Sequence, residues 1–150
     1  PTRRSSDLFY LNYGAKFANI KDGTSNTVAM TELIQALSPN GTPAVLDRRA
    51  RFWNDDSGTY QISTKLGPNS QAPDYGRCAH DPGNKAPCIN DFDVNNTINF
   101  YLAARSKHPG GVNALLADGS VRFVRDTINL PTWRALSSEA GGEVVSSDAY

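Results

Sequence analysis

Ser106, His108 and Asp118 are the residue types of a hydrolytic triad, and they lie within a span of thirteen residues. A triad needs a strained serine turn, with the histidine within hydrogen-bond reach of the hydroxyl and an acid behind it. No Gly-x-Ser-x-Gly motif is present. Asp118-Gly119 indicates a hairpin turn, which places His108 and Asp118 at opposite ends of one strand, more than about 10 Å apart. We therefore expect a structural clasp formed by His108, Asp118 and Gly119, with no catalytic residue.

His108 then needs another partner. We expect it to pin a loop by hydrogen bonding to the backbone or to a neighbouring carboxylate. The start of the C-terminal helix and the segment Asp126-Thr127 are the candidates for that contact.

The only two cysteines, Cys78 and Cys88, are ten residues apart in a proline-rich stretch that includes His80 and Asp81. In an exported protein such a pair forms a disulfide, which closes a loop that little else orders. Free thiols and a zinc site are the alternatives. The spacing matches no usual zinc finger or ribbon, so we expect a disulfide and no metal or other cofactor.

Residues 91–95 begin like a calcium loop, with oxygen ligands at alternate positions. The sixth position is Asn96 where glycine is needed, and the twelfth is Leu102, which cannot supply a bidentate carboxylate. We interpret this segment as a solvated acidic turn.

Length and charge set the limits for the rest of the chain. One domain is expected from 150 residues, and 39% apolar residues suffice for a core. Lys plus Arg and Asp plus Glu number 15 each, so the formal net charge is zero. That balance argues against a nucleic-acid partner, since phosphates require an excess of cations. No apolar run is long enough to span a membrane.

Residues 112–124 are expected to form a β-hairpin. A two-residue turn at Asp118-Gly119 pairs Ala117 with Ser120 and Leu115 with Arg122. In that register one clean apolar face, which we expect to face the core, carries Val112, Ala114, Leu116, Val121 and Phe123.

A short helix is expected next, with Asn129 as its cap, Pro131 in its first turn and Gly141-Gly142 at its end. Its apolar stripe is Leu130, Trp133 and Leu136. Further strands are expected over residues 27–34, 51–53, 59–63 and 98–103, with a long irregular loop over residues 67–93.

Residues 1–8 can be back-translated into the end of a widely used short-read sequencing adapter. We expect them to be extraneous, although a basic, serine-rich natural N-terminus is the alternative. The chain has no initiator Met. The natural protein is therefore expected to extend upstream of residue 9, and residues 9–150 are expected to form one truncated domain.

Three motifs resemble one known family. The run from His108 to Asp118-Gly119, with nine residues between, resembles the C-terminal signature of a planctomycete-type, prepilin-like family of unknown function. Residues 22–27 (Asp-Gly-Thr-Ser-Asn-Thr), with Glu32 following, and residues 140–148 (Ala-Gly-Gly-Glu-Val-Val-Ser-Ser-Asp) resemble its other segments. Lys107 departs from the arginine common there.

The resemblance implies an α+β fold: a pilin-like antiparallel sheet with a short C-terminal helix, here without the long N-terminal helix. It implies export to the cell envelope, which suits a disulfide. The expected function is a non-enzymatic, pseudopilin-like subunit of a surface filament or secretion-linked assembly, with pilin-like subunits or envelope components as partners. Some classifications file the family with bacterial solute-binding proteins. The alternative is thus an extracytoplasmic solute- or glycan-binding module, with Trp53, Tyr60 and Tyr75 as a stacking surface.

Overall fold

The computed structural model describes residues 8–10, 13–36, 47–51, 61–91, 99–142 and 145. The strands are β1 (Phe9–Tyr10), β2 (Tyr13–Gly14), β3 (Val28–Thr31), β4 (Asp74–Gly76), β5 (Cys88–Asn90), β6 (Gly111–Leu116) and β7 (Val121–Arg125). The helical elements are η1 (Phe17–Asn19), η2 (Thr24–Asn26), η4 (Pro82–Asn84) and the α-helix α1 (Leu130–Ala135). The predicted α+β fold, with an antiparallel sheet and one short helix, is confirmed.

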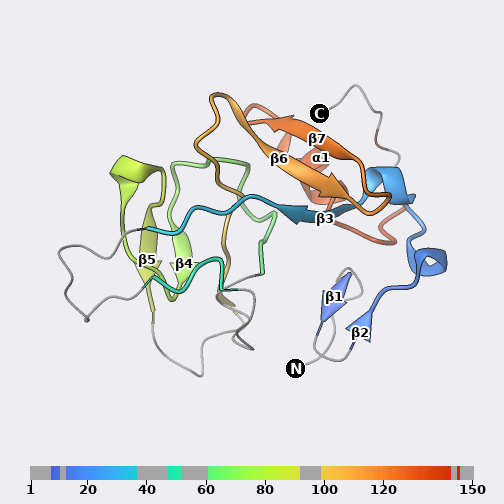
Figure 1. Cartoon of the computed structure of the whole chain (residues 1–150), viewed down its shortest axis with the longest axis horizontal. Coiled ribbons are helices and arrows are strands. Elements are labelled where there is room, and N and C mark those ends of the chain that lie inside the picture. The colour runs from blue at the N-terminus through green and yellow to red at the C-terminus, as the bar shows by residue number, and fades with distance from the viewer. Residues whose placement is uncertain are drawn as a thin grey trace.

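A three-stranded antiparallel sheet of order β3-β6-β7 dominates one end of the molecule, and α1 lies against one of its faces (Figure 1). Trp133 and Leu136 are fully buried and pack with Val112, Ala114 and Val124. Asn129 precedes α1 and Pro131 lies in its first turn, but the Asn129 side chain forms no capping bond. The helix ends at Ala135, six residues before Gly141, so the expected glycine stop is wrong.

The predicted hairpin is confirmed, but its register is shifted by one residue. Leu115 pairs with Val121, and Val112 pairs with Val124. The loop holds three residues, since Gly119 N donates to Leu116 O (3.0 Å) and Leu116 N donates to Ser120 O (2.8 Å). Gly119 has φ +88°, the glycine position of such a three-residue loop.

This shift exchanges the two faces of β7. A one-residue slip moves every side chain of a strand to the opposite face. Val124 therefore faces the core, whereas Val121 and Phe123 are 63% and 44% exposed. The expected placement of Val121 and Phe123 on the core face is wrong.

The other end of the molecule is less regular, but it is not the irregular loop that the sequence suggested. β4 and β5 pair in parallel, and η4 lies between them in sequence (Figure 1). Within the expected strand over residues 98–103, the described part forms only single bridges, Tyr75 to Tyr101 and Ile62 to Leu102. The expected strand over residues 27–34 is confirmed in shorter form as β3. Residues 1–7, most of the segment expected to be extraneous, lie outside the described residues. So do residues 52–60, which include most of the expected strand over residues 51–53 and the start of the one over residues 59–63.

Candidate functional site

Glu32 is the partner of the His108 side chain, a pairing that the sequence alone did not identify. Residue 32 follows β3, and the register Thr31 to Ala114 places it beside Asn113 of β6. Glu32 Oε2 accepts a bond from Asn113 N (2.7 Å), and Oε1 lies 3.1 Å from His108 Nε2. A neighbouring carboxylate therefore holds His108, as one expectation proposed. The candidate contacts with Asp126-Thr127 and with the start of the helix are wrong, because β3 brings Glu32 closer.

Ser106 joins the same cluster, but in an order that does not suit a hydrolase. Its hydroxyl hydrogen-bonds to Glu32, while Ser106 Oγ accepts a bond from the backbone N–H of His108 (3.1 Å). A serine nucleophile needs the imidazole of histidine as its base. Here the Ser106 hydroxyl and the His108 imidazole both hydrogen-bond to the Glu32 carboxylate, and Ser106 is buried. The geometry fits a clasp around Glu32 better than a catalytic triad.

Glu32 is held in its ionised form. Burial raises the pKa of its carboxyl group. The Asn113 N–H, the Ser106 hydroxyl, the Asn113 amide and the charge of His108 together outweigh that effect and hold the pKa below its usual value. An ionised acceptor strengthens each of these bonds.

Asp118 and Gly119 lie beyond the other end of β6 and make separate contacts. Asp118 Oδ1 accepts bonds from Ser120 N (2.8 Å) and Ser120 Oγ (2.6 Å). The backbone N–H of Asp118 donates to Thr24 O (3.1 Å). The Ser120 hydroxyl, followed by its N–H, lowers the pKa of Asp118. Asp118 thus stabilises the hairpin loop and joins it to η2.

Asp22 links the motif over residues 22–27 to the motif over residues 140–148 by hydrogen bonds. Its Oδ2 accepts bonds from Gly141 N (2.7 Å) and Ser138 Oγ (2.9 Å), and its Oδ1 accepts a bond from Gly142 N (2.8 Å). Lys21 N also donates to Glu139 O (2.7 Å). The segments that resembled family motifs are therefore in mutual contact, through carboxylates that accept backbone N–H bonds.

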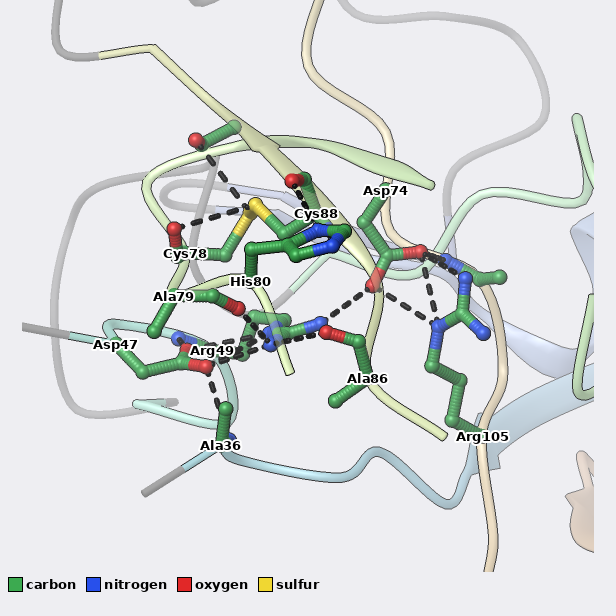
Figure 2. The surroundings of a disulfide bond; sticks show 12 residues. Ala36, Asp47, Arg49, Asp74, Cys78, Ala79, His80, Ala86, Cys88 and Arg105 are labelled. Atoms are coloured by element: carbon green, nitrogen blue, oxygen red, sulfur yellow. Dashed lines mark hydrogen bonds and ion pairs between the residues drawn. A yellow bond between two sulfur atoms is a disulfide. The ribbon is translucent and has the colours of Figure 1, made fainter. Parts of the chain in front are cut away.

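Cys78 and Cys88 form a buried disulfide with a Cα–Cα distance of 6.0 Å, as predicted (Figure 2). The free-thiol and zinc alternatives are excluded, since each sulfur is bonded to the other. The N–H of Cys88 donates to His80 Nδ1 (3.1 Å), so the nearby histidine supports the disulfide loop. Within the described ranges, no three His, Cys, Asp or Glu side chains converge as a metal site would require.

A buried charge cluster, formed by Asp47, Arg49, Asp74 and Arg105, lies beside the disulfide (Figure 2). Asp74 Oδ2 accepts a bond from Arg49 Nη1 (2.9 Å). Asp74 Oδ1 accepts bonds from Arg105 Nη2 (2.9 Å) and Ala103 N (3.0 Å). Arg49 also binds Asp47 (2.6 Å). All four side chains are at most 2% exposed, and their charges sum to zero.

The contacts of Arg49 explain how its charge is accommodated in the buried charge cluster. Burial disfavours its charge, but Asp47 and Asp74 outweigh that effect and hold its pKa above the ordinary value. Its guanidinium also donates to the carbonyl oxygens of Ala79 (2.8 Å) and Ala86 (3.2 Å), on either side of η4. No local pattern predicts this cluster, because Asp74 and Arg105 are distant in sequence from Asp47 and Arg49.

Tyr75, from the expected stacking surface, is engaged within the protein. Its hydroxyl donates to Asp91 Oδ2 (2.5 Å), and its ring packs against Phe100 and Tyr101. Asp91, the first residue of the expected acidic turn, is thus bound to a tyrosine. Trp53, Tyr60 and residues 92–95 lie outside the described residues.

An open groove with a volume of about 600 Å³ lies beside Glu32 and His108. Residues 32–35, after β3, line one part of it, and residues 105–109, before β6, line the rest. The apolar residues of its lining are Leu33, Ile34 and Pro109. The polar ones are Glu32, Gln35, Arg105, Ser106, Lys107 and His108. The groove can admit a small molecule between these two segments.

Replacing Asp74 with asparagine should destabilise the protein by about 3–5 kcal/mol, because two buried arginines lose their shared carboxylate. Equilibrium denaturation in urea measures this. Asp126→Asn is the matched control, since Asp126 is an exposed carboxylate that accepts a bond from Asn69 Nδ2 (2.8 Å); its loss should stay within about 1 kcal/mol. Equal losses for the two variants would show that the cluster is not a major stabilising element.

The hydrogen bonds that Asp22 accepts should make the unfolding free energy of the protein sensitive to acid. Burial raises the pKa of Asp22, but bonds from Gly142 N–H, Gly141 N–H and the Ser138 hydroxyl together hold it below the ordinary 3.8. Its stabilisation is therefore complete above pH 3.8 and is lost as the pH falls below that value. The difference in unfolding free energy between the native protein and Asp22→Asn should shrink from pH 7 to pH 3. A difference independent of pH would contradict this.

In the described part of the chain, no helix is long and apolar enough to cross a membrane. No curated protein and no solved structure matches the chain significantly. A family model described as "Protein of unknown function (DUF1559)" matches residues 2–130, which is most of the chain. That range includes the Asp22 segment, Glu32, the disulfide, the buried charge cluster and the hairpin. The chain belongs to this DUF1559 family of unknown function.

Proposed function

We propose that this protein is a non-enzymatic, pseudopilin-like subunit of a surface filament or secretion-linked assembly in the cell envelope. The observation that carries the proposal is an apolar surface on the face of the β3-β6-β7 sheet opposite α1. We call this the outer face and define it by Met30, Leu115, Val121 and Phe123.

The outer face crosses all three strands. The register places Met30 beside Leu115, and Leu115 beside Val121. Met30 is 59% exposed, and Val121 and Phe123 are also exposed. An antiparallel sheet with one solvated face normally carries polar side chains on that face. Large contiguous apolar patches on a protein surface commonly mark interaction sites, so the outer face suits a covering element.

The prepilin-like resemblance implies such a covering element, the long N-terminal helix. In pilin-like heads a long helix covers one face of the sheet, and neighbouring subunits pack around it. The disulfide supports the envelope location, because disulfides persist in oxidising compartments outside the cytoplasm. The planctomycete-type motifs support the same assignment. Their carboxylates accept the backbone hydrogen bonds described above, next to the sheet that carries the outer face.

A second candidate function is binding of a small solute or glycan outside the cytoplasm. The groove beside Glu32 and His108 favours it, since small-molecule sites are concave and combine apolar walls with a few polar groups. A solute that raises the melting temperature of the purified protein, and fails to do so for a groove variant such as Leu33→Trp, would support this function.

The main proposal predicts that Met30→Asp prevents assembly. A charge on the outer face opposes burial of that face, so the variant should be absent from sheared surface filaments or from the large envelope complex of the native cell. Ile89→Asp is the matched control, because Ile89 is 51% exposed on β5, away from the outer face. This control should be incorporated normally.

The measurement is quantitative immunoblotting of the assembled and free fractions, with circular dichroism of both purified variants to verify folding. A folded, exported Met30→Asp protein that enters the assembly at the native level would overturn the proposal.

A further inference from the structure

Glu32 is the one acidic residue among the described residues that line the groove, and its carboxylate is already filled with hydrogen bonds. Oε2 accepts a bond from Asn113 N (2.7 Å). Oε1 accepts a bond from Asn113 Nδ2 (3.3 Å) and lies 3.1 Å from His108 Nε2. The Ser106 hydroxyl also hydrogen-bonds to this carboxylate. A carboxylate has about four lone-pair sites, so Glu32 has little accepting capacity left for a ligand.

The buried guanidinium of Arg105, which also lines the groove, is committed as well. Its Nε and Nη2 donate to the two oxygens of Asp74 (3.0 and 2.9 Å). Its Nη1 donates to Ser70 O (2.6 Å), and Nη2 also donates to Ala72 O (2.9 Å). Because Asp74 compensates its charge and protein oxygens occupy its donors, Arg105 adds little net charge to the groove.

Lys107 differs from both of these residues, because its charge is not compensated. It lines the groove and also a smaller adjoining hollow of about 250 Å³, whose other walls come from residues 83–85. Lys107 is exposed. Lys85 Nζ donates to Ser106 O and His108 O (both 3.3 Å), so a second ammonium group lies against the backbone on either side of residue 107. Carbonyl oxygens accept these bonds without cancelling the charge.

No carboxylate in the described part of the chain forms an ion pair with Lys85 or Lys107. Asp81, which precedes η4, accepts bonds from the Asn84 backbone N–H (3.3 Å) and from Asn84 Nδ2 (2.7 Å). Two positive charges therefore stand at one end of a groove whose own carboxylate is occupied. The unused hydrogen-bonding capacity at that end consists chiefly of ammonium N–H donors.

We propose that the groove binds a small solute that carries a carboxylate, with the carboxylate at the Lys107 end. The inference deepens the second candidate function, small-solute binding, and rests on it. Ammonium groups bind carboxylates through charge-assisted hydrogen bonds, so the charge distribution selects an acidic solute over a neutral one. Leu33 and Pro109 supply an apolar wall for the ring or hydrocarbon part. The groove volume of about 600 Å³ lies within the usual range of small-molecule sites.

Acidic sugars and aliphatic acids share this chemistry, and matched pairs of solutes separate them. Glucuronate and glucose have the same ring and differ in the carboxylate, and succinate and succinamide differ in the same way. Each solute is titrated at constant ionic strength into the isotopically labelled full chain, while the backbone amide NMR signals of residues 32–35 and 105–108 are followed. We expect at least one acid to shift these signals saturably, and its neutral counterpart to bind roughly tenfold more weakly.

Lys107→Met tests the role of the charge, since methionine keeps much of the side-chain length and removes the ammonium group. The affinity for the acid should fall by roughly five- to tenfold, which corresponds to the loss of one partly exposed charge-assisted contact. Lys16→Met is the matched control, because Lys16 is an exposed lysine before η1 that lines neither hollow. This control should bind the acid as the native protein does.

Three results would overturn the inference: equal affinity for an acid and its neutral counterpart, acid binding that Lys107→Met leaves unchanged, or no acid that shifts the groove signals. None of these results decides the second candidate function, because the melting-temperature test with Leu33→Trp includes neutral solutes. The assembly proposal is also tested separately, by Met30→Asp on the outer face.

Discussion

The carboxylate of Asp74 is the point on which the arrangement of this protein depends. From the first residue of β4 it binds Arg49, Arg105 and the backbone of Ala103. Arg105 N in turn donates to Glu32 O (2.9 Å), just beyond β3. The disulfide-bonded end and the sheet are thus joined through one buried anion. A buried carboxylate is costly unless its charge is compensated and its lone pairs are filled, and the two arginines do both.

Three carboxylates in the segments that resemble family motifs serve a related purpose near the surface. Asp22, Glu32 and Asp118 each accept at least one backbone N–H bond from a different part of the chain or from their own loop. These bonds hold segments that have little regular secondary structure. Three of the exposed large apolar side chains among the described residues, Met30, Val121 and Phe123, lie together on the outer face. This grouping is the basis of the proposed role in assembly.

Local signals in the sequence predicted part of this structure. The hairpin, the Trp133 and Leu136 stripe and the disulfide depend on neighbouring residues, and each is present. The register failed because Asp118-Gly119 suits both a two-residue and a three-residue loop. In the structure the three-residue loop contacts η2 through the bond from Asp118 N to Thr24 O, a contact between segments distant in sequence. Asp47 and Arg49 are two positions apart, but Asp74 joins them to Arg105 across 25 and 31 positions, and Glu32 and His108 are 76 positions apart, so no local pattern could reveal these contacts.

The proposed role requires the outer face to be covered when the protein is in its native assembly. Met30 reports on this directly, since it is the only methionine of the chain and is 59% exposed on that face. Oxidation of a methionine to its sulfoxide is detected by mass spectrometry. Met30 in the native envelope assembly, treated with dilute hydrogen peroxide, should be oxidised several-fold more slowly than Met30 in the purified protein. Equal oxidation rates in the two samples would contradict the account.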